Sequence, residues 1–307
     1  MTTSSAVFGL LLCAIGFAQA SAPGASAQPA PRLKASDIDT ITLHRPAQRF
    51  AYGTDSLQFG ELRLPEGRGP FPVAILIHGG CYLSKYATVR NSAALADALA
   101  SAGVATWNVE YRRYDHPGGG WPGTFADVAA GADYLRILSK QQPLDLGRVI
   151  VMGHSAGGQL ALWLGAQAKH PTASPLFREA PIKVIGVVAL GPITDMREYQ
   201  TRELKSCGNP AIESVLGGLP DAVPDRVRMV SPIELLPLRV PTVLVAGEQD
   251  GIAPTSALNA YASAARLKGD RVQIFASPNE GHFDALAPSR LAGKTAIAQA
   301  LALLGVR

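Results

Sequence analysis

Short apolar runs that alternate with helical segments constrain the fold of this chain more than any other feature. Each run has four to seven residues, few of them polar, as is typical of strands covered on both faces. The runs are residues 73–77, 104–109, 149–152, 184–190, 242–246 and 272–275. Helical patterns occur at residues 92–102, 124–138, 156–168, 256–268 and 289–304. This alternation predicts an α/β fold with a mostly parallel, doubly wound sheet, helices on both faces, and a ligand site beyond the carboxyl ends of the strands.

The same pattern predicts the domain organisation. The 307 residues are 47% hydrophobic, which is enough for one large core, so we expect one domain over residues 55–307 after a linker or N-terminal segment at 28–54. Residues 57–64 alternate apolar and polar side chains before Pro65, which predicts an antiparallel edge strand. Residues 192–238 are rich in charge, proline and glycine and interrupt the alternation, so we expect a small lid-like insertion there.

The first 27 residues have the pattern of an export signal. Residues 7–17 are apolar but too few to span a bilayer, and two small-x-small tripeptides follow, ending at Ala20 and Ala27. We therefore expect a signal peptide over residues 1–27, cleavage after Ala20 or Ala27, a periplasmic or secreted protein, and no stable membrane span. No Lys or Arg precedes the apolar stretch, so a buried helix or a wrongly assigned start is the alternative.

Charge and motifs exclude several classes of partner. The formal net charge of +4 comes from dispersed Lys and Arg, with no run longer than Arg112-Arg113, so no nucleic-acid surface is expected. The sequence has no His-Glu-x-x-His, no cluster of Cys and His and no P-loop, so no motif in it points to a metal or nucleotide site. The oligomeric state is left open.

Ser155 lies at the centre of a Gly-x-Ser-x-Gly pattern, Gly153-His154-Ser155-Ala156-Gly157, between an apolar run and a helical segment. A sharp strand-to-helix turn strains the backbone and leaves no room for side chains two residues to either side, which explains the glycines. The pattern therefore predicts that Ser155 is a nucleophile, whereas the alternative is a serine that caps the helix.

A serine hydroxyl needs a general base and a carboxylate that orients the base. Asp250 and His282 follow two later strands in the order that this architecture uses, so we expect a triad of Ser155, Asp250 and His282. The alternatives to Asp250 are other nearby acids, namely Glu248, Glu280 and Asp284.

Residues 78–81, His-Gly-Gly-Cys, follow the strand at 73–77 and are expected to supply an oxyanion hole. The glycines let the backbone curl, so that the N–H groups of Gly80 and Cys81 point inward and Ala156 adds a third donor. An ordinary Gly-Gly turn is the alternative.

These motifs, with Gly281-His282-Phe283, resemble the α/β-hydrolases of the esterase and lipase type over about residues 55–305. The histidine before Ser155 and the stretches at 110–113 and 121–128 are similar to the bacterial feruloyl-esterase-like and kynurenine-formamidase-like branch. Cys81 replaces the third glycine that hormone-sensitive-lipase relatives carry, which argues against a lipase. The resemblance implies hydrolysis of small carboxylic esters through an acyl-enzyme, without a cofactor.

Two further expectations concern the cysteines and the reaction. Removal of the signal would leave Cys81 and Cys207, either free or joined in one disulfide that would tie the oxyanion turn to the insertion. The same triad could instead cleave amides, as in an arylformamidase or a peptidase-like hydrolase, and a binding module without catalysis is a third alternative.

Overall fold

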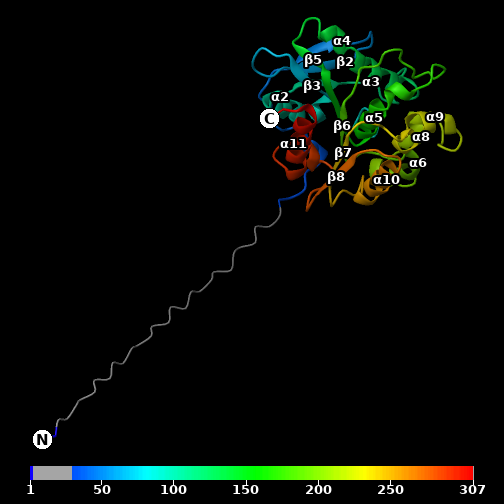
Figure 1. Cartoon of the computed structure of the whole chain (residues 1–307). Helices are drawn as coiled ribbons and strands as arrows, with labels where there is room; N and C mark the ends of the chain where they lie inside the picture. The colour runs from blue at the N-terminus through cyan, green and yellow to red at the C-terminus, as the bar shows by residue number, and fades with distance from the viewer. Residues whose placement is uncertain (3–29, 307) are drawn as a thin grey trace. The chain divides into compact units, whose positions relative to one another are not determined.

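One eight-stranded sheet is the framework of the described part of the chain, residues 1–2 and 30–306 of this computed structural model (Figure 1). The strands are β1 (Gln48–Ala51), β2 (Phe59–Arg63), β3 (Phe71–Ile77), β4 (Ala105–Val109), β5 (Leu144–His154), β6 (Gly186–Leu190), β7 (Thr242–Gly247) and β8 (Val272–Ser277). Their order is β1-β2-β4-β3-β5-β6-β7-β8, with antiparallel pairing only at β1–β2 and β2–β4. The winding direction reverses at β3, and ligands of such sheets bind beyond the carboxyl ends of the strands at this point. The predicted fold class is confirmed.

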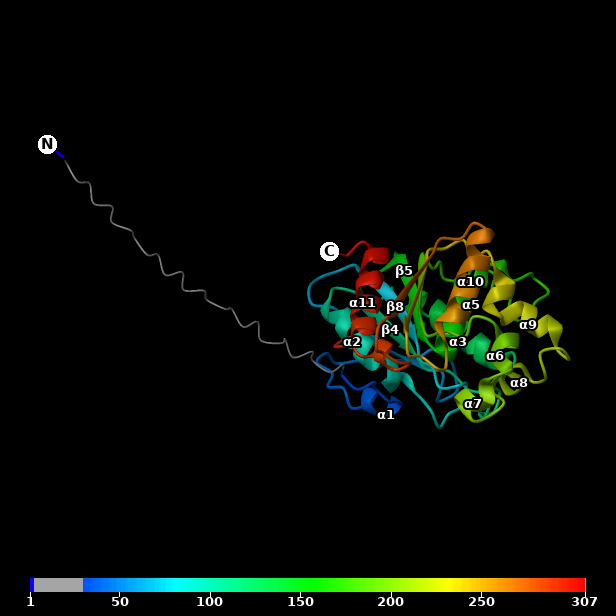
Figure 2. The same cartoon turned by 90° about the horizontal axis from the view of Figure 1, so that it is seen from below.

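Helices cover both faces of the sheet, as Figure 2 shows. The larger ones are α2 (Ala93–Ser101), α3 (Gly123–Asp133), α5 (Ala156–Gly165), α10 (Thr255–Leu267) and α11 (Leu291–Leu304), and α4 (Leu135–Leu138) follows α3. Alternate residues of β3 point to opposite faces: Ile75 belongs to the core cluster that includes residues of α3, α5 and α10, whereas Leu76 belongs to the cluster with residues of α2 and α11. Both faces of the strand are therefore buried, which explains its continuous apolar sequence.

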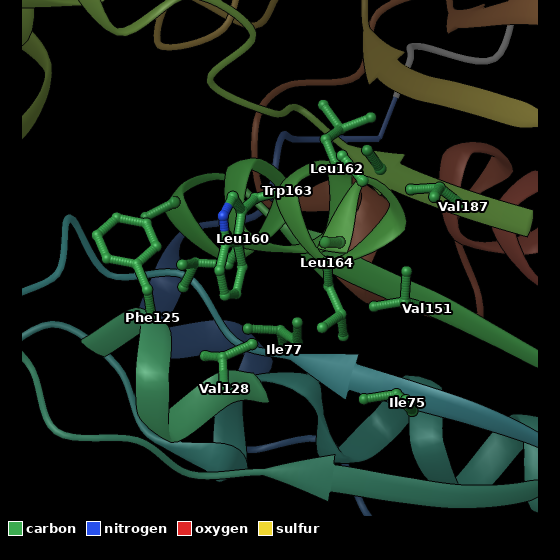
Figure 3. Close-up of a cluster of buried hydrophobic side chains, with 14 of the residues drawn as sticks. Ile75, Ile77, Phe125, Val128, Val151, Leu160, Leu162, Trp163, Leu164 and Val187 are labelled. Atoms are coloured by element: carbon green, nitrogen blue, oxygen red, sulfur yellow. The ribbon is translucent and has the colours of Figure 1, made fainter. Parts of the chain in front are cut away.

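The core on one face fixes the position of α5. Figure 3 shows Leu160 and Trp163 of α5 beside Phe125 of α3 and above Ile77 of β3. The rings of Phe125 and Trp163 meet edge to face, with centroids 5.3 Å apart. Because a fully buried tryptophan contributes several kcal/mol, about 3–5 when truncated to alanine, this contact anchors the helix that begins directly after Ser155.

The N-terminal segment adds two elements to the compact unit formed by residues 32–307. They are α1 (Ala35–Ile38) and β1, which pairs with β2 and forms the edge of the sheet. β2 is antiparallel as predicted, but it is an inner strand because β1 lies outside it. The expected signal peptide, residues 1–27, lies outside the described residues apart from the first two.

The segment at 192–238 contains short helices between β6 and β7. They are α6 (Met196–Gln200), α7 (Glu203–Cys207), α8 (Ala211–Leu216) and α9 (Pro224–Val230). Ile212, Val215 and Val227 are completely buried in the same core as α5, and the Gln159 side chain donates to the Val230 carbonyl at 2.7 Å. In the described part of the chain, no helix combines the length and the apolar character that a membrane span requires.

Candidate active site

Ser155 occupies the sharp turn between β5 and α5. Its backbone has φ 56° and ψ −120°, which few non-glycine residues adopt, and its N–H donates to the Leu190 carbonyl at 2.8 Å. A Cβ at Gly153 would lie 2.0 Å from the Gly157 carbonyl oxygen, and one at Gly157 would lie 2.2 Å from the Ile77 carbonyl oxygen. Glycine is therefore required at both positions, because any side chain would clash with the backbone of the turn.

His282 and Asp250 form a buried hydrogen-bonded pair. The Nδ1 atom of His282 lies 2.7 Å from Oδ2 of Asp250, and the N–H groups of Ile252 and Ala253 donate to Oδ1 at 2.8 Å. Burial alone would raise the pKa of Asp250, but His282 and these hydrogen bonds lower it below its ordinary value. The carboxylate therefore stays ionised and orients the imidazole.

Gly191, at the end of β6, lies directly against this pair. A Cβ there would be 2.9 Å from Oδ2 of Asp250 and 3.0 Å from Nδ1 of His282, and the backbone has φ +48°. Any side chain at Gly191 would therefore both strain the backbone and push the pair apart.

The other acidic residues near His282 have different roles. Glu280 accepts hydrogen bonds from the backbone N–H groups of Leu291 and Ala292 at the start of α11, at 2.8 and 2.7 Å. Asp284 accepts from the Gly281 N–H at 2.8 Å. Of the four acids considered from the sequence, Asp250 is the one that contacts the His282 ring.

The turn after β3 carries the backbone N–H groups of Gly80 and Cys81. Both residues have positive φ, 98° and 52°, and within the described chain neither N–H has a hydrogen-bond partner. A Cβ at Gly80 would lie 2.8 Å from that of Ala87, so the tight curl needs glycine. Ala156 is the first residue of α5, where backbone N–H groups have no partner within the helix.

A cavity of about 440 Å³ brings these groups together. Ser155, His282, Gly80 and Cys81 all line it, and none of its lining residues is Asp, Glu, Lys or Arg. Phe283 lines the cavity, whereas Tyr111 and Trp163 are fully buried in the core. The cavity is therefore largely apolar, and none of the side chains that line it is acidic, Lys or Arg.

A disulfide joins Cys81 to Cys207 of α7 and forms part of the cavity wall. The two Cα atoms are 6.0 Å apart, and 126 residues of sequence separate the cysteines. Beside it, the Tyr86 hydroxyl donates to the Cys207 carbonyl at 2.7 Å. The insertion also contacts the loop that carries Asp250, because the Arg202 guanidinium donates to the Ile252 carbonyl.

Comparison with known proteins identifies the family of this chain. Residues 61–263 match the model of the BD-FAE family, a domain of the α/β-hydrolase esterases. The chain belongs to the BD-FAE family. As a member it is a carboxylic ester hydrolase. Comparison with curated protein sequences found no match.

Solved structures share the fold of this BD-FAE chain at low sequence identity. A truncated carbohydrate esterase from gut microbiota is 21% identical, with 84% of this chain and 96% of that chain covered and a TM-score of 0.70. Esterase B of Lactobacillus rhamnosis is 19% identical, with 86% and 85% covered and a TM-score of 0.71. Thermogutta terrifontis esterase 2, solved after reaction with tabun, is 16% identical, with 84% and 94% covered and a TM-score of 0.65.

The BD-FAE chain supports the turn after β3 with a buried charged network that the sequence did not reveal. Nε2 of His78 lies 2.8 Å from the Glu110 carboxylate, which also accepts from the Val89 N–H at 3.2 Å and pairs with Arg113. Burial alone would raise the pKa of Glu110, but His78 and Arg113 lower it to about 2. The His78 ring also stacks on Tyr111 at 4.4 Å. The only sequence signal was the stretch at 110–113, directly after β4.

His154, the residue before Ser155, holds the turn that carries His282. Its Nε2–H donates to the His282 carbonyl at 3.0 Å, and the two rings lie 4.4 Å apart. Burial, reinforced by the charge of His282, lowers the pKa of His154 to about 3. His154 is therefore neutral at physiological pH, and it joins the serine turn to the histidine turn.

Within residues 1–2 and 30–306, no group of three or more His, Cys, Asp or Glu side chains has the arrangement of a metal site.

Proposed function

We propose that the protein hydrolyses neutral carboxylic esters through an acyl-enzyme on Ser155, with His282 as general base and Asp250 as its orienting carboxylate. The observation that carries the proposal is one cavity lined by Ser155 and His282, in which the imidazole lies 2.7 Å from a buried Asp250. A nucleophile, a base and an orienting acid are the parts that this chemistry needs.

The proposed reaction has two balanced halves. In the first, Ser155 Oγ attacks the ester carbonyl carbon while His282 Nε2 takes the hydroxyl proton. The carbonyl oxygen becomes an oxyanion, which the N–H groups of Gly80, Cys81 and Ala156 stabilise. The C–O bond to the alcohol then breaks, and His282 returns the proton to the departing oxygen. In the second half, water repeats the attack and releases the carboxylic acid and free Ser155.

The character of the cavity supports neutral substrates. A charged acyl or alcohol group would lose its hydration in a cavity lined by no Asp, Glu, Lys or Arg, and nothing there would compensate. The volume of about 440 Å³ lies within the range of small-molecule sites. Because one structural neighbour is named a carbohydrate esterase, acylated sugars belong among the esters to be tested.

We also propose that the protein is exported, after signal cleavage at Ala20 or Ala27. The disulfide between Cys81 and Cys207 supports this, because such bonds persist mainly in oxidising compartments. Sequencing the N-terminus of the protein from its native host tests the cleavage site, and an intact Met1 would contradict export by this signal.

We further propose that residues 192–238 form the wall that covers the cavity, because Ser206, Cys207 and Gly208 line it.

An ester panel tests the proposed reaction. It comprises p-nitrophenyl acetate, butyrate and octanoate, an acetylated sugar, and the p-nitroanilide of acetic acid as the matched amide. We expect the esters to be cleaved by the parent protein and by Ser206→Ala, whose serine lines the same cavity away from the turn. Ser155→Ala should lose at least about 10³-fold in kcat. Full activity of Ser155→Ala would refute the mechanism, and faster cleavage of the anilide than of the acetate would favour an amidase.

A further inference from the structure

The short N-terminal segment at residues 32–35 lies against the active-site cavity. Ala35, the first residue of α1, lines the same cavity as Ser155 and His282. α1 is held in place by Ile38, which is 1% exposed and packs in the core with α2 and α11. A segment of polar and small residues, expected to be a linker, therefore contributes a side chain to the site.

Two sets of backbone hydrogen bonds hold this segment in place. Upstream of α1, the Leu33 N–H lies 3.4 Å from both carboxylate oxygens of Asp284. Downstream, the Arg90 guanidinium donates to the Asp39 carbonyl at 2.9 and 2.7 Å and to the Ile41 carbonyl at 2.8 Å. Because these contacts recognise backbone atoms, they fix the path of the chain on both sides of Ala35.

Asp284 connects the segment to the turn that carries His282. The carboxylate is completely buried, accepts from the Gly281 N–H at 2.8 Å and lies 3.2 Å from Nε of Arg290. Gly281 immediately precedes His282, and a Cβ at Gly281 would lie 3.3 Å from the Arg32 side chain. One buried carboxylate thus holds both the base-bearing turn and the N-terminal segment.

We propose that residues 32–35 form a size-selecting wall of the ester site, and that Asp284 is the positioning residue that seats this wall against the His282 turn. The inference rests on the proposed ester hydrolysis at Ser155. Ala35 presents only a methyl group, so the wall limits the bulk of the substrate without selecting its charge. Ser206 and Gly208 of the insertion also line the cavity.

Enlarging Ala35 tests the wall. The measurement is the ratio of kcat/KM for p-nitrophenyl octanoate to that for p-nitrophenyl acetate, in which any loss common to both esters cancels. Ala35→Phe should lower this ratio at least about tenfold, because pocket size discriminates by roughly 10–200-fold per methylene. Ser36→Phe is the matched control, since Ser36 is exposed and does not line the cavity, and its ratio should stay unchanged. If Ala35→Phe does not fold, Ala35→Leu should lower the ratio in the same direction.

Weakening the contact of Asp284 with the N-terminal segment should raise the octanoate-to-acetate ratio. In Asp284→Asn, hydrogen exchange at the amides of Leu33 and Ala35 should become faster, and the ratio should rise because the wall yields to the longer acyl chain. An unchanged ratio in both Ala35 variants, or a ratio that falls in Asp284→Asn despite faster exchange, would overturn the inference. Such results would leave the proposed function intact, because that proposal is tested separately, by whether Ser155→Ala still hydrolyses the acetate.

Discussion

The disulfide between Cys81 and Cys207 should stabilise the protein and preserve its oxyanion turn. The perturbation is the double variant Cys81→Ser, Cys207→Ser, which removes the bond without leaving a lone thiol. With a sequence separation of 126 between the cysteines, the loss of loop-closure entropy in the unfolded chain corresponds to about 5 kcal/mol at 25 °C. This value is an upper bound, because the unfolded chain keeps some structure.

The catalytic effect follows from the position of Cys81. Its N–H is a proposed oxyanion donor, and loss of one such donor costs about 10²–10³ in kcat. The bond is one of several ties between the insertion and the site, together with the Tyr86 hydroxyl to the Cys207 carbonyl and Arg202 to the Ile252 carbonyl, so a fall of up to about 100-fold is expected.

Two assays check this prediction. Urea unfolding measures the free energy of unfolding, and ester hydrolysis at a temperature where both proteins are folded measures kcat. Alkylation of the mature protein without reductant, followed by intact-mass analysis, should label neither Cys81 nor Cys207. Two labelled thiols in active protein, or a double variant with parental stability and turnover, would refute the reasoning.

Three further predictions concern single side chains. Gly191→Ala should lower kcat at least about 100-fold in ester assays with circular dichroism unchanged, because its Cβ would lie 2.9 Å from Asp250 Oδ2; near-parental kcat would contradict this. Asp250→Asn should lower kcat about 10⁴-fold, because the amide no longer favours the required tautomer of His282, and a loss below tenfold would point to another acid. His154 takes up its proton at pH 6.5 when unfolded but at about 3 when folded, so stability should fall by at most about 5 kcal/mol as the pH drops between these values. Urea titrations should show a shallower fall for His154→Gln, and identical curves would contradict the prediction.

The inner strands of the sheet could be predicted from the sequence, because a strand that is buried on both faces consists mainly of apolar residues. β3, β6 and β7 are apolar and buried over almost their whole length, because they lie in the interior of the sheet. β1 has no such apolar pattern, because its four residues are mostly exposed. It forms by backbone pairing with β2. Sequence patterns therefore predict buried strands better than this exposed edge.

Some residues of the candidate site could be predicted from a local motif, whereas others come together only in the folded chain. Ser155 and the glycines around it are required by local geometry at one turn, so a short motif was enough to find them. The choice of Asp250 over Glu280 and Asp284 depends on how three loops meet in space, and the structure assigns each of those acids a different partner. Ala35 and Leu33 could not be found from any local pattern, because the contact of Leu33 with Asp284 spans 251 residues.

The insertion is better described by its attachments than by its composition. Its charge, proline and glycine content predicted a lid-like insertion. Val215 and Val227 are completely buried in the main core, and a disulfide joins α7 to the turn after β3. The amino-acid composition of such a segment reflects mainly its exposed side chains, whereas its buried side chains determine how stably the segment packs on the domain.

The nucleophilic character of Ser155 is tested most directly by a fluorophosphonate probe. The folded parent protein, incubated with the probe and digested, should carry the adduct on the peptide that contains Ser155, and ester hydrolysis should fall in proportion to labelling. His282→Ala should label at least about 100-fold more slowly, because the base that takes the serine proton is missing. Adduct on a different residue, or an active enzyme whose Ser155 stays unlabelled, would contradict the account.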